Sequence, residues 1–93
     1  MRAVVDGNVI AESNETVVVE GNHYFPPDSV NREYLSDTDR TTVCGWKGTA
    51  SYYSLNVNGK TLENVAWYYP EPKDAVAEIV NYVAFYPQVT VEE

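Results

Sequence analysis

Short apolar runs separated by turn residues follow one another along most of the chain. Two such runs, residues 3–5 and 9–11, flank an Asp-Gly-Asn segment at residues 6–8. Gly and Asn readily adopt the positive φ angles of a tight turn, so this pattern predicts an antiparallel hairpin. The next run, residues 16–20, has a continuous apolar centre and ends at Gly21. Such a run is typical of a strand covered on both faces.

Prolines and polar residues interrupt the pattern in the middle of the chain. Pro26 and Pro27 have no amide donor, so we do not expect residues 23–27 to continue a strand. Residues 28–33 are ambiguous between a short helical turn and a strand. The Ser-Asp-Thr-Asp segment at residues 36–39 is typical of a loop.

Alternation is clearest in the second half of the chain. Strand-forming residues resume at 41–44, and residues 51–57 alternate so that odd-numbered positions share one face. The Asn-Gly pair at 58–59 predicts a hairpin that returns through residues 60–62. After a break, residues 65–69 alternate in the same way, with odd-numbered positions opposite the even-numbered ones.

One short helix is predicted near the C-terminus. Pro72 suits the first helical position, and the apolar residues that follow have the spacing i, i+3, i+4 and i+7. This stripe consists of Val76, Ile79, Val80 and Val83. Residues 83–85 are equally consistent with a strand, and residues 89–91 predict the last strand. We therefore expect one mainly β domain over residues 1–93, with one short C-terminal helix.

Composition excludes several classes of partner. The chain has 14 acidic and 6 basic residues, a net charge of −8, which disfavours nucleic acids and anionic membranes. No stretch approaches the length of a membrane span, and the N-terminus lacks the apolar run of a signal peptide. A single cysteine, Cys44, permits no internal disulfide and fits a reducing compartment. We expect a soluble, cytoplasmic protein.

The unusual feature is the number of aromatic residues, with eight Tyr, two Trp and two Phe. Half of them lie between residues 46 and 69. They are Trp46, Tyr52, Tyr53, Trp67, Tyr68 and Tyr69. Neighbours on a strand point to opposite faces, so these rings cannot all enter one core. Both an aromatic-lined pocket and plain packing between two sheets remain open.

Five residues are candidates for contact with a ligand. They are Trp46, Lys47, Tyr52, Trp67 and Tyr69. Lys47 lies in a short loop bracketed by glycines, where its three N–H donors could hold an anionic or carbonyl group. A solvated loop lysine is the alternative.

Candidates for catalysis are weaker. Cys44 could act as a nucleophile with His23 as its base, but a small buried cysteine and a structural histidine are the more common roles. Asp37 and Asp39 have the spacing of a metal-binding carboxylate pair, although such loops are usually only solvated. One Cys and one His do not complete a structural zinc site. We predict no metal or other cofactor.

Three segments, residues 18–27, 42–53 and 66–72, together resemble the family named domain of unknown function 427. The resemblance implies a β-tent architecture, with two antiparallel sheets packed at a steep angle, similar to the ligand-binding domain of cereblon. Relatives in that fold often hold zinc with two Cys-x-x-Cys motifs, which this chain lacks. The aromatic cage of those relatives suggests analogous roles for the candidate rings, although fold does not fix function.

Three classes of function follow from these observations. The leading prediction is a binding module for a small molecule or peptide, with an aromatic-lined pocket and without catalysis. An enzyme is the first alternative, because the family has also been labelled a nucleotidyltransferase family, but only Asp37 and Asp39 support that label and no phosphate-binding loop accompanies them. A protein-interaction domain that docks through exposed tyrosines, including a homodimer, is the second alternative.

Overall fold

The computed structural model describes residues 1–93, and most of its regular structure is β. The strands are β1 (Arg2–Val5), β2 (Asn8–Glu12), β3 (Val17–Val19), β4 (Asn22–Tyr24), β5 (Leu35–Cys44), β6 (Gly48–Val57), β7 (Lys60–Tyr68), β8 (Val83–Phe85) and β9 (Thr90–Glu92). Three short 3₁₀ helices complete the fold, namely η1 (Pro27–Ser29), η2 (Arg32–Tyr34) and η3 (Asp74–Ile79). No helix has the length and apolar composition needed to cross a bilayer.

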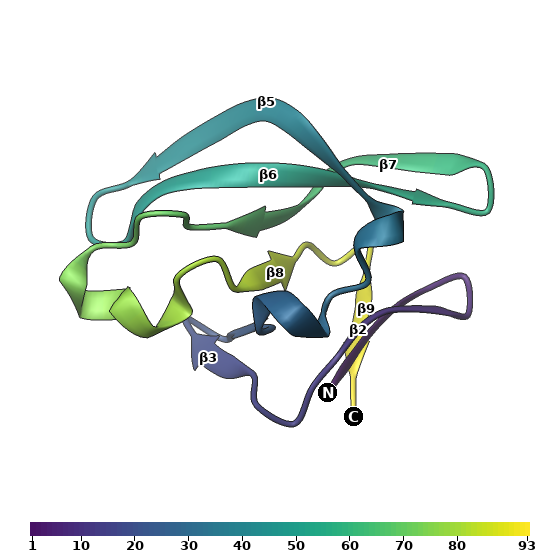
Figure 1. Cartoon of the computed structure of the whole chain (residues 1–93), viewed down its shortest axis with the longest axis horizontal. Coiled ribbons are helices and arrows are strands. Elements are labelled where there is room, and N and C mark those ends of the chain that lie inside the picture. Colours follow the sequence, from purple (N-terminus) through teal and green to yellow (C-terminus); the bar gives the residue numbers. More distant parts are fainter.

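The strands form three antiparallel sheets, with strand orders β2-β1-β9, β3-β4 and β5-β6-β7-β8. The long strands β5, β6 and β7 lie together at the top of Figure 1, with β2, β9 and β3 below them. Arg2 pairs with Glu92, so the two ends of the chain are neighbours (Figure 1). The prediction of a mainly β fold is confirmed, but the number of sheets is three, not two. The steep packing angle stays a prediction.

Both early hairpins turn through residues with positive φ. Asp6 (φ 48°) and Gly7 (φ 78°) connect β1 to β2, which confirms the predicted hairpin. Glu20 (φ 52°) and Gly21 (φ 78°) connect β3 to β4 with the same geometry. The prediction that residues 23–27 contain no strand is therefore wrong. The ladder runs to residue 24 and ends before the first proline, where a missing amide donor would interrupt it.

The strand predicted to be covered on both faces is covered on only one. Val18, in the middle of β3, is exposed, whereas Val19 is buried. The reason is topological, because β3 pairs only with β4 in a two-stranded sheet and no further layer covers its outer face.

Residues 36–39, predicted as a loop, lie inside β5. Asp37 pairs with Tyr53 and Thr41 with Ser51, so β5 has two more residues than β6 between these pairs. The excess forms a bulge, in which the Thr38 hydroxyl accepts a hydrogen bond from the amide of Arg40 at 3.3 Å. Polar residues typical of loops fit within this strand because the bulge leaves the extra residues of β5 without a partner on β6.

A second bulge changes the alternation along β7. Tyr53 pairs with Ala66 and Leu55 with Leu62, so β7 has two more residues than β6 there, and Asn64 has φ 54°. The predicted break is thus a bulge within one continuous strand. Val65 consequently packs with Ala66, and the prediction that it shares a face with the odd-numbered positions 67 and 69 is wrong.

The predicted C-terminal helix is not present as a continuous helix. Its place is taken by η3, in which Val76 (φ −132°) has a non-helical backbone. Val76 and Ile79 are buried, but Val80 is exposed and Val83 begins β8. Pairing of β8 with β7 competes with the last helical turn, so the strand alternative for residues 83–85 is the correct one.

Two hydrophobic clusters form on opposite faces of the four-stranded sheet. The first contains Tyr53, whose ring stacks on Tyr68 with centroids 4.5 Å apart. The second contains Tyr52, Trp67 and Tyr69. The expected division of the aromatic residues between two faces is confirmed.

Candidate functional site

A cavity of about 490 Å³ adjoins the second cluster. Its lining comes from the β3–β4 hairpin, the β5–β6 loop, strands β6 and β7, and the C-terminal segment. The lining residues are Gly21, Asn22, His23, Lys47, Tyr52, Trp67, Tyr69, Phe85, Tyr86, Pro87, Val89 and Val91. Five of these twelve residues are aromatic, and another, Lys47, carries an ammonium group.

The structure brings four of the five predicted ligand contacts to this cavity. They are Lys47, Tyr52, Trp67 and Tyr69. Trp46 does not line it and is 45% exposed. Lys47 Nζ lies 5.4 Å from the centre of the Trp46 ring, so Trp46 covers the lysine from outside the cavity.

The loop that carries Lys47 is held by its backbone. The Lys73 amide donates to the Lys47 carbonyl at 2.9 Å, and Lys73 Nζ donates to the Gly45 carbonyl at 2.7 Å. Gly48 has φ 120°, and a Cβ at this position would lie 3.2 Å from the Glu71 carbonyl oxygen. Glycine permits both the backbone angle and the close approach, so the segment after β7 fixes the loop.

Lys47 is 7% exposed, which is unusual for a lysine, and its ammonium hydrogen-bonds to the Glu20 carboxylate. The ammonium also lies 5.7 Å from the centre of the Tyr69 ring. Burial by itself lowers the pKa of Lys47, but the hydrogen bond to Glu20 and the nearby phenol groups outweigh it and raise the pKa above the ordinary value. The ammonium therefore stays charged at neutral pH.

Trp67 is held by a buried hydrogen bond. Its Nε1 donates to the hydroxyl oxygen of Tyr24 at 3.1 Å, and the two rings meet edge to face with centroids 6.2 Å apart. Tyr24 is fully buried. Burial raises the pKa of Tyr69 although Lys47 opposes the shift, so this phenol is neutral at physiological pH.

Tyr52 and Tyr86 line the cavity as a stacked pair. Their ring planes are 9° apart and their hydroxyl oxygens are 3.3 Å apart. The Tyr52 hydroxyl also hydrogen-bonds to Thr42 at 2.9 Å, and the Arg40 guanidinium lies 5.1 Å from the Tyr52 ring centre. Tyr86 further contacts Trp67, with centroids 4.7 Å apart.

This pair has opposite pKa shifts. Burial raises the pKa of Tyr52, but hydrogen bonds with Thr42 and Tyr86, together with the nearby Arg40 guanidinium, outweigh burial and lower the pKa below its ordinary value. The hydrogen bond to Tyr52, followed by burial, raises the pKa of Tyr86. Tyr52 is thus the first of the two to ionise.

Two important residues of the site were missed at the level of sequence. Tyr86 follows β8 directly, and its position next to a predicted strand was the available signal. Glu20 reaches Lys47 only because the β3–β4 hairpin folds against the β5–β6 loop, and no local pattern indicates that contact.

The candidate catalytic residues do not assemble into a reactive group. His23 lines the cavity, and its Nδ1 lies 3.1 Å from the Thr16 hydroxyl, while Cys44 is partly buried at the end of β5. Asp37 and Asp39 are both exposed on β5. Nowhere do three or more His, Cys, Asp or Glu side chains gather in a way that could hold a metal ion.

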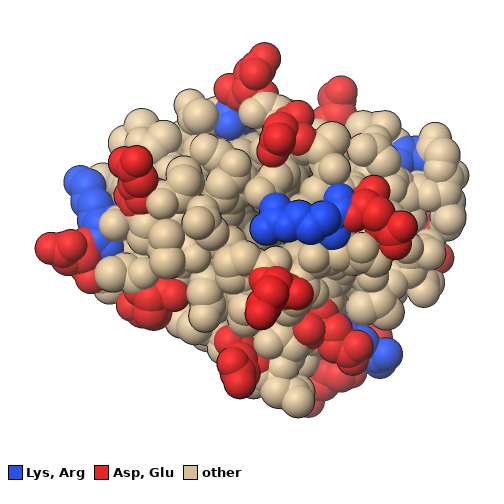
Figure 2. All heavy atoms as spheres, viewed as in Figure 1, with Lys and Arg blue, Asp and Glu red and all other residues tan.

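Charge is distributed differently from the aromatic residues. Acidic side chains are scattered over the face seen in Figure 2 and do not gather in one patch. The cavity lining itself contains no carboxylate. The local charge at the cavity therefore comes from Lys47 and its partner Glu20, despite the net charge of −8.

Comparison with known proteins gives one match. A family model described as a domain of unknown function, DUF427, matches residues 1–93. A search of curated proteins finds no matching protein.

Proposed function

Because the chain belongs to the DUF427 family, whose description assigns no activity, we propose a function from the geometry of the site: a binding module for a small planar molecule or a peptide with a planar side chain. The observation that carries this proposal is the cavity walled by Tyr52, Trp67, Tyr69 and Tyr86 beside a buried ammonium. Concave, largely apolar sites with few polar groups are typical of small-molecule binding.

Size and accessibility support a ligand. A volume of about 490 Å³ lies within the range of ligand cavities. Tyr86 is 37% exposed although its ring stacks on Tyr52, so one wall of the cavity is open to solvent. The aromatic faces offer stacking surfaces, and Lys47 supplies a directional polar contact.

The enzyme alternative has no specific observation in its favour. Asp37 and Asp39 are solvated on a strand, and neither lines the cavity. His23 lines the cavity, but Cys44 does not. A nucleotidyltransferase or a Cys/His-dependent activity therefore remains less favoured than binding.

A second candidate function, protein interaction, rests on exposed apolar residues at the end of β5. Val43 is 81% exposed and Trp46 is 45% exposed. Strand β5 is one of the two edge strands of its sheet, and unpaired strand edges can pair with another chain. Sedimentation at increasing concentration tests a homodimer, and a Val43→Asp variant should weaken it. A species that stays monomeric at all concentrations would argue against this version.

The binding proposal is tested by a fragment screen with planar compounds, read by ligand-observed NMR. Tyr86→Ala should reduce the signals of bound compounds because it removes an exposed wall of the cavity. Tyr34→Ala is the matched control, since Tyr34 is partly buried against the first cluster and does not line the cavity. Equal loss in both variants, or no bound compound with the wild type, would contradict the proposal.

A further inference from the structure

The ammonium of Lys47 has donors that the protein does not use. An ammonium carries three N–H donors, and the Lys47 Nζ makes one hydrogen bond to a protein acceptor, the Glu20 carboxylate. The residue is 7% exposed and lines the cavity. A buried cation is stabilised only by partners, so the unused donors favour an acceptor inside the cavity.

If the Glu20–Lys47 ion pair separated, water would solvate Glu20 more easily than Lys47. Its side chain is 52% exposed and stands on the β3–β4 turn, where φ is 52°. Water can replace Lys47 as its partner, since the carboxylate is half solvated already. Lys47, in contrast, needs a replacement for Glu20 because burial in its loop leaves little access to water. Another carboxylate could therefore replace Glu20 in this ion pair while Lys47 stays in its buried position.

The charge of the lining favours an anion over a cation. The lining contains Lys47 and no carboxylate, although the whole chain is acidic. Aromatic walls alone would also suit a quaternary ammonium ligand. Here, however, the Tyr69 face already has the Lys47 ammonium 5.7 Å from its centre, and a second cation would be repelled.

The positions of the rings define the shape of the ligand. Tyr69 lies beside the ammonium, and Trp67 and Tyr86 continue the wall with ring centroids 4.7 Å apart. A ligand with an acidic group at one edge and a flat ring behind it would place the acid on Lys47 and the ring against these aromatic faces.

Resting on the binding function proposed above, we propose that the cavity selects planar aromatic monoanions, and that the carboxylate of the ligand takes the place of Glu20 on Lys47. Glu20 is then a built-in competitor that keeps the buried ammonium paired while the cavity is empty. The ligand would make both a charge-assisted hydrogen bond to Lys47 and contacts with the aromatic rings, whereas Glu20 makes only the hydrogen bond.

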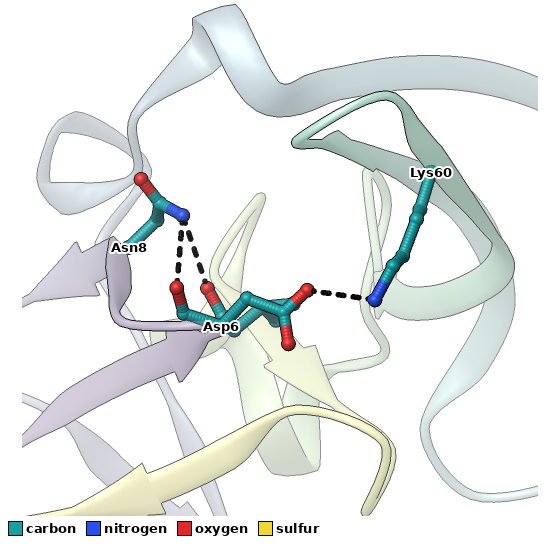
Figure 3. A network of polar contacts seen from close by, with 4 residues as sticks. Asp6, Asn8 and Lys60 are labelled. Atoms are coloured by element: carbon teal, nitrogen blue, oxygen red, sulfur yellow. Dashed lines mark hydrogen bonds and ion pairs between the residues drawn. The ribbon is translucent and has the colours of Figure 1, made fainter.

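The test compares indole-3-carboxylate with the neutral indole-3-carboxamide by calorimetric titration. The carboxylate should bind the wild type about tenfold more tightly, because it forms an ion pair with the Lys47 ammonium, whereas the carboxamide oxygen is a neutral acceptor. Lys47→Met should remove this preference and leave carboxamide binding nearly unchanged. Lys60→Met is the control, because Lys60 forms an exposed ion pair with Asp6 at 3.2 Å, away from the cavity (Figure 3).

The displacement of Glu20 is tested separately. Glu20→Gln should bind the carboxylate about two- to fivefold more tightly, since it removes a competitor from a partly exposed ion pair. Glu63→Gln, at an exposed position of β7, should change nothing. The comparison of Glu20→Gln with Glu63→Gln tests the inference even if Lys47→Met fails to fold.

Each outcome decides between the two proposals. Equal affinity for carboxylate and carboxamide would overturn the anion inference and leave the binding function intact. Unchanged or weaker carboxylate binding by Glu20→Gln would overturn the exchange at Lys47. If neither indole binds and no other planar compound does, the binding function fails and the inference fails with it.

Discussion

The ammonium of Lys47 lies 5.7 Å from the centre of the Tyr69 ring. This contact joins the β5–β6 loop to the residue that follows β7, and both residues line the cavity. Because the lysine is buried and charged, its surroundings supply a carboxylate and aromatic faces in place of water. The predictions below test the parts of the structure that hold this arrangement.

Gly48→Ala should destabilise the protein by about 1–3 kcal/mol. Gly48 has φ 120°, and an added Cβ would lie 3.2 Å from the Glu71 carbonyl oxygen. Gly45→Ala is the matched control, because Gly45 has no positive φ and no atom within 4 Å of an added Cβ. Urea unfolding followed by circular dichroism measures both. Similar free energies of unfolding for the two variants would contradict the account of the loop.

Tyr24→Phe should lower the free energy of unfolding by about 1–3 kcal/mol. The change removes the acceptor of the Trp67 indole N–H and leaves a buried donor unpaired. Tyr82→Phe is the control, because Tyr82 is only partly buried against the same cluster. Chemical unfolding of both variants checks the result. A Tyr24→Phe protein as stable as the wild type would show that the indole hydrogen bond contributes little.

The stabilising effect of Glu20 should disappear in alkali. Burial opposes the shift, but the hydrogen bond to Glu20 helps to raise the pKa of Lys47 in the folded state above its value in the unfolded chain. A raised folded pKa gives stability that is complete below the unfolded value, about pH 10.4, and is lost as pH rises through the folded value. The difference in free energy of unfolding between wild type and Glu20→Gln should thus be constant from neutral pH to about pH 9 and shrink above about pH 10.5.

Urea titrations of both proteins across this pH range provide the measurement, with Glu63→Gln as the control for loss of an acidic charge. A difference that persists undiminished in strong alkali would mean that Glu20 does not act through the Lys47 ammonium.

Tyr52 should ionise at lower pH than Tyr86. Although burial raises the pKa of Tyr52, its hydrogen bonds with Thr42 and Tyr86 and the nearby Arg40 guanidinium lower it below the ordinary value, and the pKa of Tyr86 is raised. Alkaline ultraviolet titration of wild type minus Tyr52→Phe should isolate a phenol that ionises below about pH 10. Thr42→Val should move that transition upward. A transition above the ordinary range, or one insensitive to Thr42→Val, would rule out the proposed hydrogen-bond effect.

Period-two alternation predicted the division of the aromatic residues because it depends only on the local backbone. Tyr52 and Tyr53 lie on opposite faces of β6 as neighbours on a strand must, and they enter different clusters. The same rule failed at Val65, since the bulge at Asn64 is set by pairing with β6. The register depends on how two strands pair, and the residue pattern of one strand alone does not determine it.

The remaining differences have the same origin in contacts between distant segments. The predicted helix was lost because Val83 pairs with Tyr68 in the sheet. Four of the five predicted site residues line the cavity because strand position and loop chemistry are local. The contact between Glu20 and Lys47 depends on how a hairpin and a loop meet, and only the folded structure contains it.

The most direct test of the binding site uses the two indole N–H signals in a ¹H–¹⁵N correlation spectrum. Trp67 lines the cavity and Trp46 lies outside it, so the chain carries its own internal control. Titration with indole-3-carboxylate should shift the Trp67 indole signal progressively and to saturation, while the Trp46 signal moves much less. A Trp67 signal that stays in place at saturating ligand, or a shift confined to Trp46, would contradict the account of the cavity.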